Sequence, residues 1–276
     1  MPSKAAHQGQ IYLHRGNLPQ ARFWFAQAVQ EARATDTQET LASTLGNLGN
    51  VCALSGEHAE AEGCYREVLD IQRIHQDPNT IGETLVNLGN VKSDAGEFEK
   101  ARAYYLEAID LLEPLNNQRA LGIVYSNLAL QEASTSQLEA AIHHFNQALD
   151  LHRAVGDEQG LANTYSQLGK TFFLAGEFRQ AEKCLNNASE HFIKLGSQPG
   201  ESAALRLLAK LYQRTGDPIS AARCLERTIQ IDLRYRLPEL KEDQEQLLIL
   251  KQQLNPPRGA KGHHSGKADS TPKSSP

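Results

Sequence analysis

The chain has 276 residues, 40% hydrophobic and 6% aromatic, which is enough to bury a sizeable core and suits helices packed through alanine and leucine. Its formal net charge of −5 argues against a dedicated nucleic-acid-binding protein, which needs a basic surface stripe. No apolar run approaches the roughly 18 residues of a membrane span and Met1–Lys4 opens into no signal-peptide core, so we expect neither a membrane nor a secreted protein.

The dominant feature of the chain is a block that recurs every 40 residues. The stretch TLGNLGNVCALSGEHAEAEGCYREVL at 44–69 is matched by TLVNLGNVKSDAGEFEKARAYYLEAI at 84–109, and weaker copies follow at 124–149 and 164–189. Self-similarity at such a period is typical of a stacked repeat array. The sequence therefore predicts six tandem repeats, at about 3–36, 37–76, 77–116, 117–156, 157–196 and 197–236.

Small residues occupy fixed columns of the repeat. One column is always alanine: Ala21, Ala61, Ala101, Ala141, Ala181 and Ala221. Five residues earlier, one copy has Ser136 and the others have glycine: Gly16, Gly56, Gly96, Gly176 and Gly216. Glycine adopts the left-handed conformation of a helix C-terminus at low cost, and alanine lets two helix backbones approach closely.

Large apolar residues fill two further columns at helical spacing. Leucine recurs eight residues before the glycine column, at Leu48, Leu88, Leu128, Leu168 and Leu208. Four residues after the alanine stands an aromatic residue or leucine: Phe25, Tyr65, Tyr105, Phe145, Leu185 and Leu225. Each repeat therefore reads as a helix–turn–helix hairpin that buries its apolar face only by stacking on its neighbours.

These columns resemble the tetratricopeptide repeat, and the 40-residue length resembles the longer variant found in Pins-type G-protein modulators and kinesin light chains. The phrases NLGN at 47–50 and 87–90 and YSN at 125–127 look particularly like that variant. The resemblance covers roughly residues 5–235 and implies an all-α, right-handed solenoid. Relative to the usual 34-residue repeat we assign the extra residues mainly to the second helix, which then runs about 18 residues.

The two ends of the array depart from the pattern. In the first hairpin Gln8 replaces the column leucine, which suits either the polar face of a terminal repeat or an array whose upstream repeats are missing. Residues 237–254 form an amphipathic segment that predicts a capping helix with its leucines on the last hairpin and its charges in water. From 255 to 276 the chain holds no large apolar residue and four Lys or Arg against one Asp, which predicts a disordered basic tail.

The positions of the cysteines follow the repeat pattern. Cys64, Cys184 and Cys224 share one column with Trp24, Tyr104 and His144, while Cys52 lies in a first helix. We interpret all of them as packing residues, since a metal site or disulfide framework needs tighter spacing. Unpaired cysteines of this kind suit a reducing cytoplasm.

Polar residues at matched helix positions form the candidate site. In tetratricopeptide proteins the matching face of the first helix lines a concave, peptide-binding groove. The amides at these positions are Asn47, Asn50, Asn87, Asn90, Asn127 and Gln167. Asparagine is a mediocre helix former, and a carboxamide offers both a donor and an acceptor to an extended peptide backbone. The alternative is that these amides bond one another or helix ends as part of packing.

The C-terminal half of the same face is cationic, through Lys170, Arg206, Lys210 and Arg214. These residues predict a pocket for acidic side chains or a free C-terminal carboxylate, against the alternative of solvated surface charge.

We find no motif for catalysis or cofactor binding, because the chain lacks HExxH, GxxxxGK[ST] and GxSxG. We therefore expect a non-enzymatic scaffold that binds a protein or peptide, without metal, cofactor, nucleic acid or membrane. A self-associating scaffold and a regulatory subunit of a signalling or enzyme complex remain alternatives, and the oligomeric state stays open.

Overall fold

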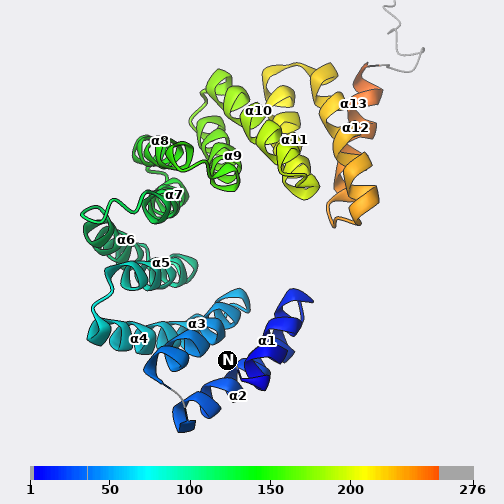
Figure 1. Cartoon of the computed structure of the whole chain (residues 1–276). Helices are drawn as coiled ribbons and strands as arrows, with labels where there is room; N and C mark the ends of the chain where they lie inside the picture. Colours follow the sequence, from blue (N-terminus) through cyan, green and yellow to red (C-terminus); the bar gives the residue numbers. More distant parts are fainter. Residues whose placement is uncertain (1–2, 36, 255–276) are drawn as a thin grey trace, which may run out of the picture.

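The computed structural model describes residues 3–35 and 37–254, and within them the chain forms thirteen α-helices and no strand (Figure 1). The helices are α1 (Lys4–His14), α2 (Leu18–Thr35), α3 (Gln38–Leu54), α4 (His58–His75), α5 (Pro78–Asp94), α6 (Phe98–Leu112), α7 (Gln118–Ser134), α8 (Leu138–Ala154), α9 (Glu158–Leu174), α10 (Phe178–Lys194), α11 (Gln198–Thr215), α12 (Pro218–Tyr235) and α13 (Leu240–Leu254). Successive pairs give the six predicted hairpins, and α13 follows as an additional helix.

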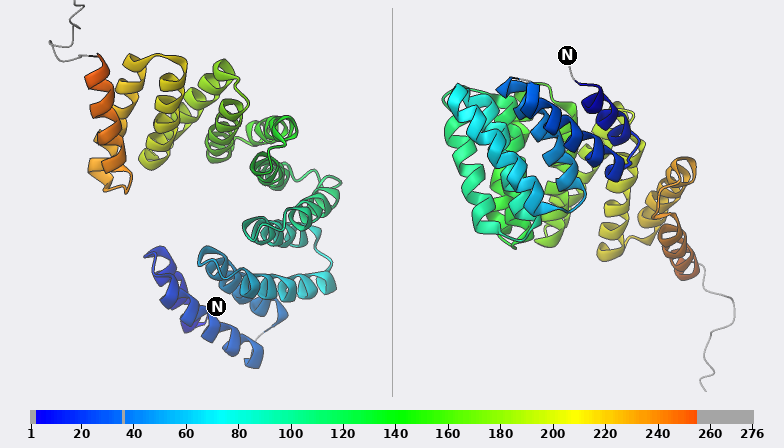
Figure 2. Two further views of the ribbon diagram at one scale, coloured as in Figure 1. Left: turned by 180° about the vertical axis from the view of Figure 1, so that it is seen from behind. Right: turned by 90° about the horizontal axis from the view of Figure 1, so that it is seen from below.

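The hairpins stack into an open, curved solenoid, as Figures 1 and 2 show. The first helices of the hairpins, α3, α5, α7, α9 and α11, lie on the inner side of the curve, and the second helices lie on the outer side. Each of these five helices contacts the second helix of its own hairpin and that of the preceding one. Because each repeat touches mainly its neighbours, the core is a strip that follows the curve.

The small-residue columns lie where helices approach most closely, as expected. All six column alanines have no exposed surface. A Cβ atom added to Gly89 would lie 2.5 Å from the ring of Tyr105, and one added to Gly49 would lie 2.9 Å from the ring of Tyr65. The aromatic column therefore fills the space that the small column leaves within the same hairpin.

The predicted turn glycines adopt the left-handed conformation, with φ between 71° at Gly16 and 81° at Gly176. Ser136 takes the same conformation, with φ 62°, although it has a side chain. An L-residue is strained there because Cβ approaches the following carbonyl oxygen. The turn between α7 and α8 is thus the one hairpin turn in the described chain that lacks its glycine.

Replacing Ser136 with glycine should therefore stabilise the protein by about 1 kcal/mol, which corresponds to about 2–4 °C in Tm. The same substitution two residues earlier is the control: Ser134→Gly changes the last residue of helix α7, where the backbone is helical, and should destabilise by no more than about 0.5 kcal/mol. Thermal unfolding followed by circular dichroism measures both. A destabilised Ser136→Gly protein would mean that the serine side chain contributes more than its backbone strain costs.

Two expectations about helix lengths need correction. The extra residues of the long repeat are shared by both helices, since α3, α5, α7 and α9 have 17 residues each, rather than being assigned mainly to the second helix. The capping helix begins at Leu240, after a turn, instead of at Leu237. The proposed tail at 255–276 lies outside the described residues.

Helix α13 covers the last hairpin with only part of its apolar surface. Leu247 and Leu250 pack against α11 and α12, whereas Leu248 and Ile249 are 59% and 54% exposed. Contrary to our expectation that its charges face water, Asp243 is completely buried. Within 3–35 and 37–254, no helix is long and apolar enough to cross a bilayer.

Candidate functional site

The inner face of the solenoid carries a row of amides, one from each of four first helices. Asn47, Asn87, Asn127 and Gln167 lie at equivalent positions of α3, α5, α7 and α9, and all are half-buried. In the part of the chain that the structure describes, none of these side-chain amides makes a hydrogen bond to another residue. Their donors and acceptors are therefore available to a ligand.

Pockets lie beside most of these amides. A pocket of about 540 Å³ between α3, α4 and α5 is lined by Asn50 and Asn87. Asn87 also lines a second pocket, of about 330 Å³, between α5 and α7. A third, of about 410 Å³, lies between α7 and α9 beside Asn127 and Gln167. The inner face thus combines concavity with unsatisfied polar groups, as a binding groove requires.

The amides of the second predicted column have a packing role. Asn50 Oδ1 accepts a hydrogen bond of 2.6 Å from the Tyr65 hydroxyl, and Asn90 Oδ1 accepts one of 2.8 Å from Tyr105. Burial raises the pKa of both phenols, which therefore stay protonated as donors. The carbonyl oxygens of Asn50 and Asn90 thus take part in packing, but through tyrosine hydroxyls and not through one another or helix ends, as the packing alternative had it.

The sequence itself carries a signal for this pairing. Asparagine occurs in this column only in the repeats whose aromatic position, 15 residues later, is tyrosine. Where that position is Phe25, Phe145, Leu185 or Leu225, the column holds Gln10, Leu130, Lys170 or Lys210. A phenylalanine or leucine has no hydroxyl to satisfy, so the asparagine is not needed there.

Arg206 is not a ligand-facing cation, contrary to our prediction. Its Nε donates to Asp243 Oδ2 at 2.8 Å, and one terminal nitrogen donates to Asp232 Oδ2 at 2.8 Å. The side chains of Asp232 and Asp243 have 0% exposure, and Ser202 donates to Asp232 at 2.6 Å. This cluster, which joins α11, α12 and α13, uses the guanidinium to neutralise two buried carboxylates.

The other three predicted cations are exposed. Lys170, Lys210 and Arg214 lie on α9 and α11, and none of them has an ion pair within residues 3–35 and 37–254. Their charges are therefore available on the C-terminal half of the inner face.

A buried histidine forms the floor of the 410 Å³ pocket. His152 Nδ1 lies 3.1 Å from Asp157 Oδ2, and His152 Nε2 lies 3.4 Å from Ser126 Oγ, which is itself 3.0 Å from Thr164 Oγ1. The order Asp–His–Ser resembles a hydrolytic triad. Ser126, however, lies inside α7, where the helix engages the backbone N–H groups that would have to bind an oxyanion. We interpret the cluster as a polar contact between repeats four and five.

The stability of that contact should depend on pH. Burial lowers the pKa of His152, an effect that Asp157 partly opposes and Arg119 reinforces. The unfolded chain then binds more protons than the folded one just below pH 6.5, so stability falls on acidification through this window. In His152→Gln this component of the pH dependence should be absent. In the wild type it changes the free energy of unfolding by about 1.4 kcal/mol for each pH unit by which folding lowers the pKa of His152.

Urea unfolding between pH 5 and 7.5 measures this dependence, with His75→Gln, at an exposed position, as the control. If the wild type and His152→Gln lose stability in parallel over that range, His152 does not titrate in the way inferred.

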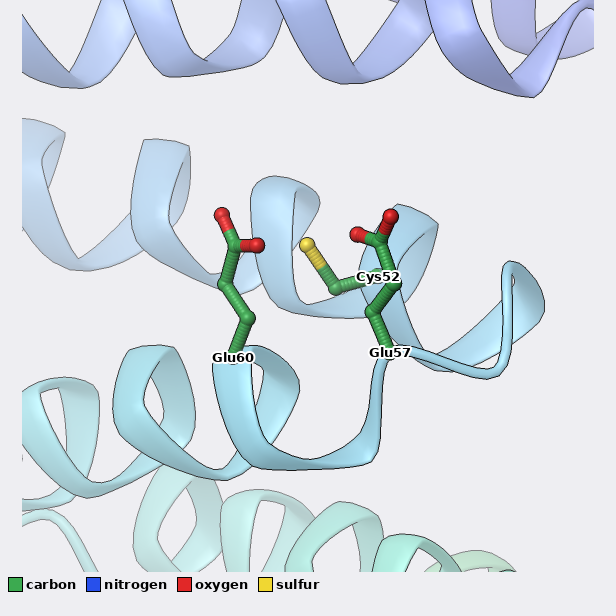
Figure 3. Close-up of side chains that lie close together, drawn as sticks. All are labelled: Cys52, Glu57 and Glu60. Atoms are coloured by element: carbon green, nitrogen blue, oxygen red, sulfur yellow. The ribbon is translucent and has the colours of Figure 1, made fainter.

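A second cluster of potential metal ligands consists of Cys52, Glu57 and Glu60, whose ligand atoms lie within 4.8 Å of one another (Figure 3). Arg22 already pairs with both carboxylates, at 2.9 Å from Glu57 and 2.5 Å from Glu60. Burial, together with these carboxylates, raises the pKa of the Cys52 thiol to about 12. A protonated thiol and two neutralised carboxylates make a poor ligand set, so the cluster fits the packing role expected of the cysteines.

Known structures share this architecture. BtubC (BKLC) from P. vanneervenii superposes with a TM-score of 0.71 at 20% identity, over 79% of this chain and 92% of that one. The STAND protein with a tetratricopeptide repeat sensor from Pyrococcus horikoshii gives a TM-score of 0.76 at 14% identity, over 91% of this chain but 38% of that one. The Rap conjugation gene regulator of plasmid pLS20, in complex with the Phr* peptide, gives 0.65 at 15% identity, over 94% and 76%.

In sequence, no curated protein matches the chain. The family model described as tetratricopeptide repeat matches residues 3–74, 80–154, 120–194 and 160–234, which together span nearly all of the six hairpins. The chain belongs to the tetratricopeptide repeat family.

Proposed function

We propose that this protein is a non-enzymatic scaffold that holds an extended segment of a partner protein, or a free peptide, in the groove along its inner face. The observation that carries the proposal is the row of half-buried amides at Asn87, Asn127 and Gln167, which have no partner within the described residues and lie beside pockets. Polar groups in such a position gain most from a ligand that hydrogen-bonds to them.

The chemistry of the amides suits a main chain as the ligand. A carboxamide both donates and accepts, so it can pair with peptide N–H and C=O groups irrespective of sequence. Lys170, Lys210 and Arg214 add charge-assisted hydrogen bonds to acidic side chains or a C-terminal carboxylate. Arg206 does not belong to this set of cations, because it already forms ion pairs with Asp232 and Asp243.

The structural comparisons support this function at the level of the fold. The pLS20 regulator, which shares the solenoid, is known in complex with the Phr* peptide. At 15% identity the likeness transfers no ligand to this chain, and the proposal rests on the groove's own residues.

The proposal is tested by selecting binders from a random 12-residue peptide library displayed on phage and measuring the affinity of synthetic versions by fluorescence anisotropy. The double variant Asn87→Ala/Asn127→Ala should bind at least about tenfold more weakly, because it loses two or more hydrogen bonds of about 1 kcal/mol each. Asn186→Ala, at an exposed position of the outer helix α10, is the matched control and should bind like the wild type.

Neither variant should unfold at a lower urea concentration than the wild type, since the groove amides make no hydrogen bonds within the described residues and alanine is the better helix former. Equal affinity of the double variant and the wild type would place the ligand elsewhere. Size-exclusion chromatography with light scattering separates this function from self-association, for which the unliganded chain would already be oligomeric.

A further inference from the structure

Helix α7 differs chemically from the other helices of the groove. On each first helix the groove-facing positions are spaced i, i+4 and i+7. These positions hold Ser43, Asn47 and Asn50 on α3; Glu83, Asn87 and Asn90 on α5; Ile123, Asn127 and Leu130 on α7; Asn163, Gln167 and Lys170 on α9. Only α7 among these four helices therefore presents two large aliphatic side chains around its amide.

Both aliphatic side chains are accessible to a ligand. Ile123 and Leu130 are each 45% exposed, although an amphipathic helix of this fold normally buries such residues. Ile123 lines both the 330 Å³ and the 410 Å³ pockets, which lie on either side of α7. Leu130 lines the larger of the two, together with the buried ring of Phe145. Ile123 and Leu130 thus form an apolar patch in the middle of the groove, between polar residues on either side. We call this patch the apolar seat.

The charge of the groove changes sign across this seat. On one side, Glu39 and Glu83 line the 540 Å³ pocket, and neither has an ion pair in the described part of the chain. On the other side, Lys170, Lys210 and Arg214 are equally unpaired. The cation Arg119 lies at the first turn of α7 and lines the 330 Å³ pocket with Glu83, so the reversal occurs at α7 itself.

From this arrangement, which rests on the proposed groove function, we infer the chemistry and direction of the ligand. It is a linear segment with one bulky aliphatic side chain that packs against Ile123 and Leu130. Its amino-terminal part, with a free ammonium or a basic side chain, lies toward Glu39 and Glu83. Its carboxyl-terminal part, with acidic side chains or the terminal carboxylate, lies toward α9 and α11. The chain direction follows because this order matches the charges of a peptide's own ends to those of the groove.

The geometry also sets the spacing of the ligand's side chains. Helix α9 contacts both α7 and α11, and packed helix axes lie roughly 8–10 Å apart. An extended chain advances about 3.3 Å per residue. An acidic residue about three positions after the aliphatic anchor therefore reaches Lys170, and one about six positions after it reaches Lys210 and Arg214.

The peptides selected from the 12-residue library, whose amino termini are free, test this inference. Enriched sequences should carry Leu, Ile or Met with Asp or Glu about three and six residues later. The double variant Ile123→Ser/Leu130→Ser should bind a synthetic selected peptide at least tenfold more weakly. Its matched control is Ile193→Ser/Leu233→Ser, which changes two side chains, each 57% exposed, on the outer helices α10 and α12 and should bind within twofold of the wild type.

A second measurement tests the direction. Moving the acidic residues of the selected peptide to the amino-terminal side of its anchor should weaken binding at least tenfold, and equal affinity would overturn the inferred direction. Peptides whose binding depends on Asn87 and Asn127 but not on Ile123 and Leu130 would overturn the apolar seat and leave the proposed function standing. If no peptide is enriched at all, the proposed function and this inference fail together.

Discussion

Replacing Arg206 with methionine should destabilise the C-terminal end of the solenoid by about 3–5 kcal/mol, which is the usual cost of removing one partner from a buried ion pair. The substitution keeps an unbranched stem but leaves the carboxylates of Asp232 and Asp243 buried without a cation. Urea unfolding and amide hydrogen exchange of α11, α12 and α13 measure the effect. We expect α13 to lose its protection first, because Asp243 anchors it to α11.

The pH dependence of this variant distinguishes a buried charge from a lost contact. Burial already raises the pKa of Asp243, an effect that Arg206 partly offsets. Without the guanidinium that pKa should rise further. The folded variant then binds more protons than the unfolded chain, so its deficit is largest at neutral pH and shrinks on acidification through the raised pKa.

Two further variants complete the test. Asp243→Asn in the Arg206→Met background should recover part of the lost stability, because an amide is buried at lower cost than a carboxylate. Arg214→Met is the control at an exposed position of the same helix and should stay within about 0.5 kcal/mol of the wild type. If Arg206→Met were as stable as Arg214→Met, Arg206 would return to the set of ligand-facing cations.

The fold of this chain could be predicted from its sequence because the packing columns repeat. Gly49 and Gly89 face Tyr65 and Tyr105 across the same gap, so a single steric requirement appears several times in the printed sequence. A second steric requirement, for a small side chain at a fully buried position, appears six times, at Ala101 and its equivalents. A requirement that recurs at a fixed period can be read without knowing any contact.

The candidate site could be predicted only in part, because its polar contacts are unique to single repeats. Arg206 pairs with Asp232 and Asp243, which lie 26 and 37 residues further along the chain, and no other repeat contains this combination. The same is true of Lys92, which is buried between Glu62 and Glu97 at 2.6 and 2.8 Å. In both cases helical position placed the residue on the correct helix but could not show which carboxylates the stacking of hairpins brings near.

Helical position also could not separate the two kinds of asparagine on the inner face. Asn47 and Asn50, three residues apart, both belong to first-helix positions that the apolar columns do not use. The structure distinguishes them by a tyrosine on the second helix, which engages Asn50 and leaves Asn47 without a partner in the described chain. The proposed ligand-binding role therefore rests on the column of Asn47, Asn87 and Asn127.

The second large loss of stability is expected from Ala101→Leu. Ala101 lies on α6 with no exposed surface, in the alanine column that lets the two helices of a hairpin approach closely. Three added carbon atoms have no space to enter, so the two helices must move apart. Overpacking of this kind costs roughly 1–3 kcal/mol, and we expect the upper part of that range because the obstructed contact is between helix backbones.

The neighbouring Arg102→Leu introduces the same side chain at an exposed position of α6 and should change the free energy of unfolding by no more than about 0.5 kcal/mol. Asn87→Ala on the groove should be near neutral or slightly stabilising, since alanine is the better helix former and Asn87 has no partner within the described residues to lose. Urea unfolding of the three variants, followed by circular dichroism at one pH, ranks them. If Asn87→Ala unfolded the protein as readily as Ala101→Leu, the amide row would be part of the packing, and the groove would lose the residues on which its function is proposed.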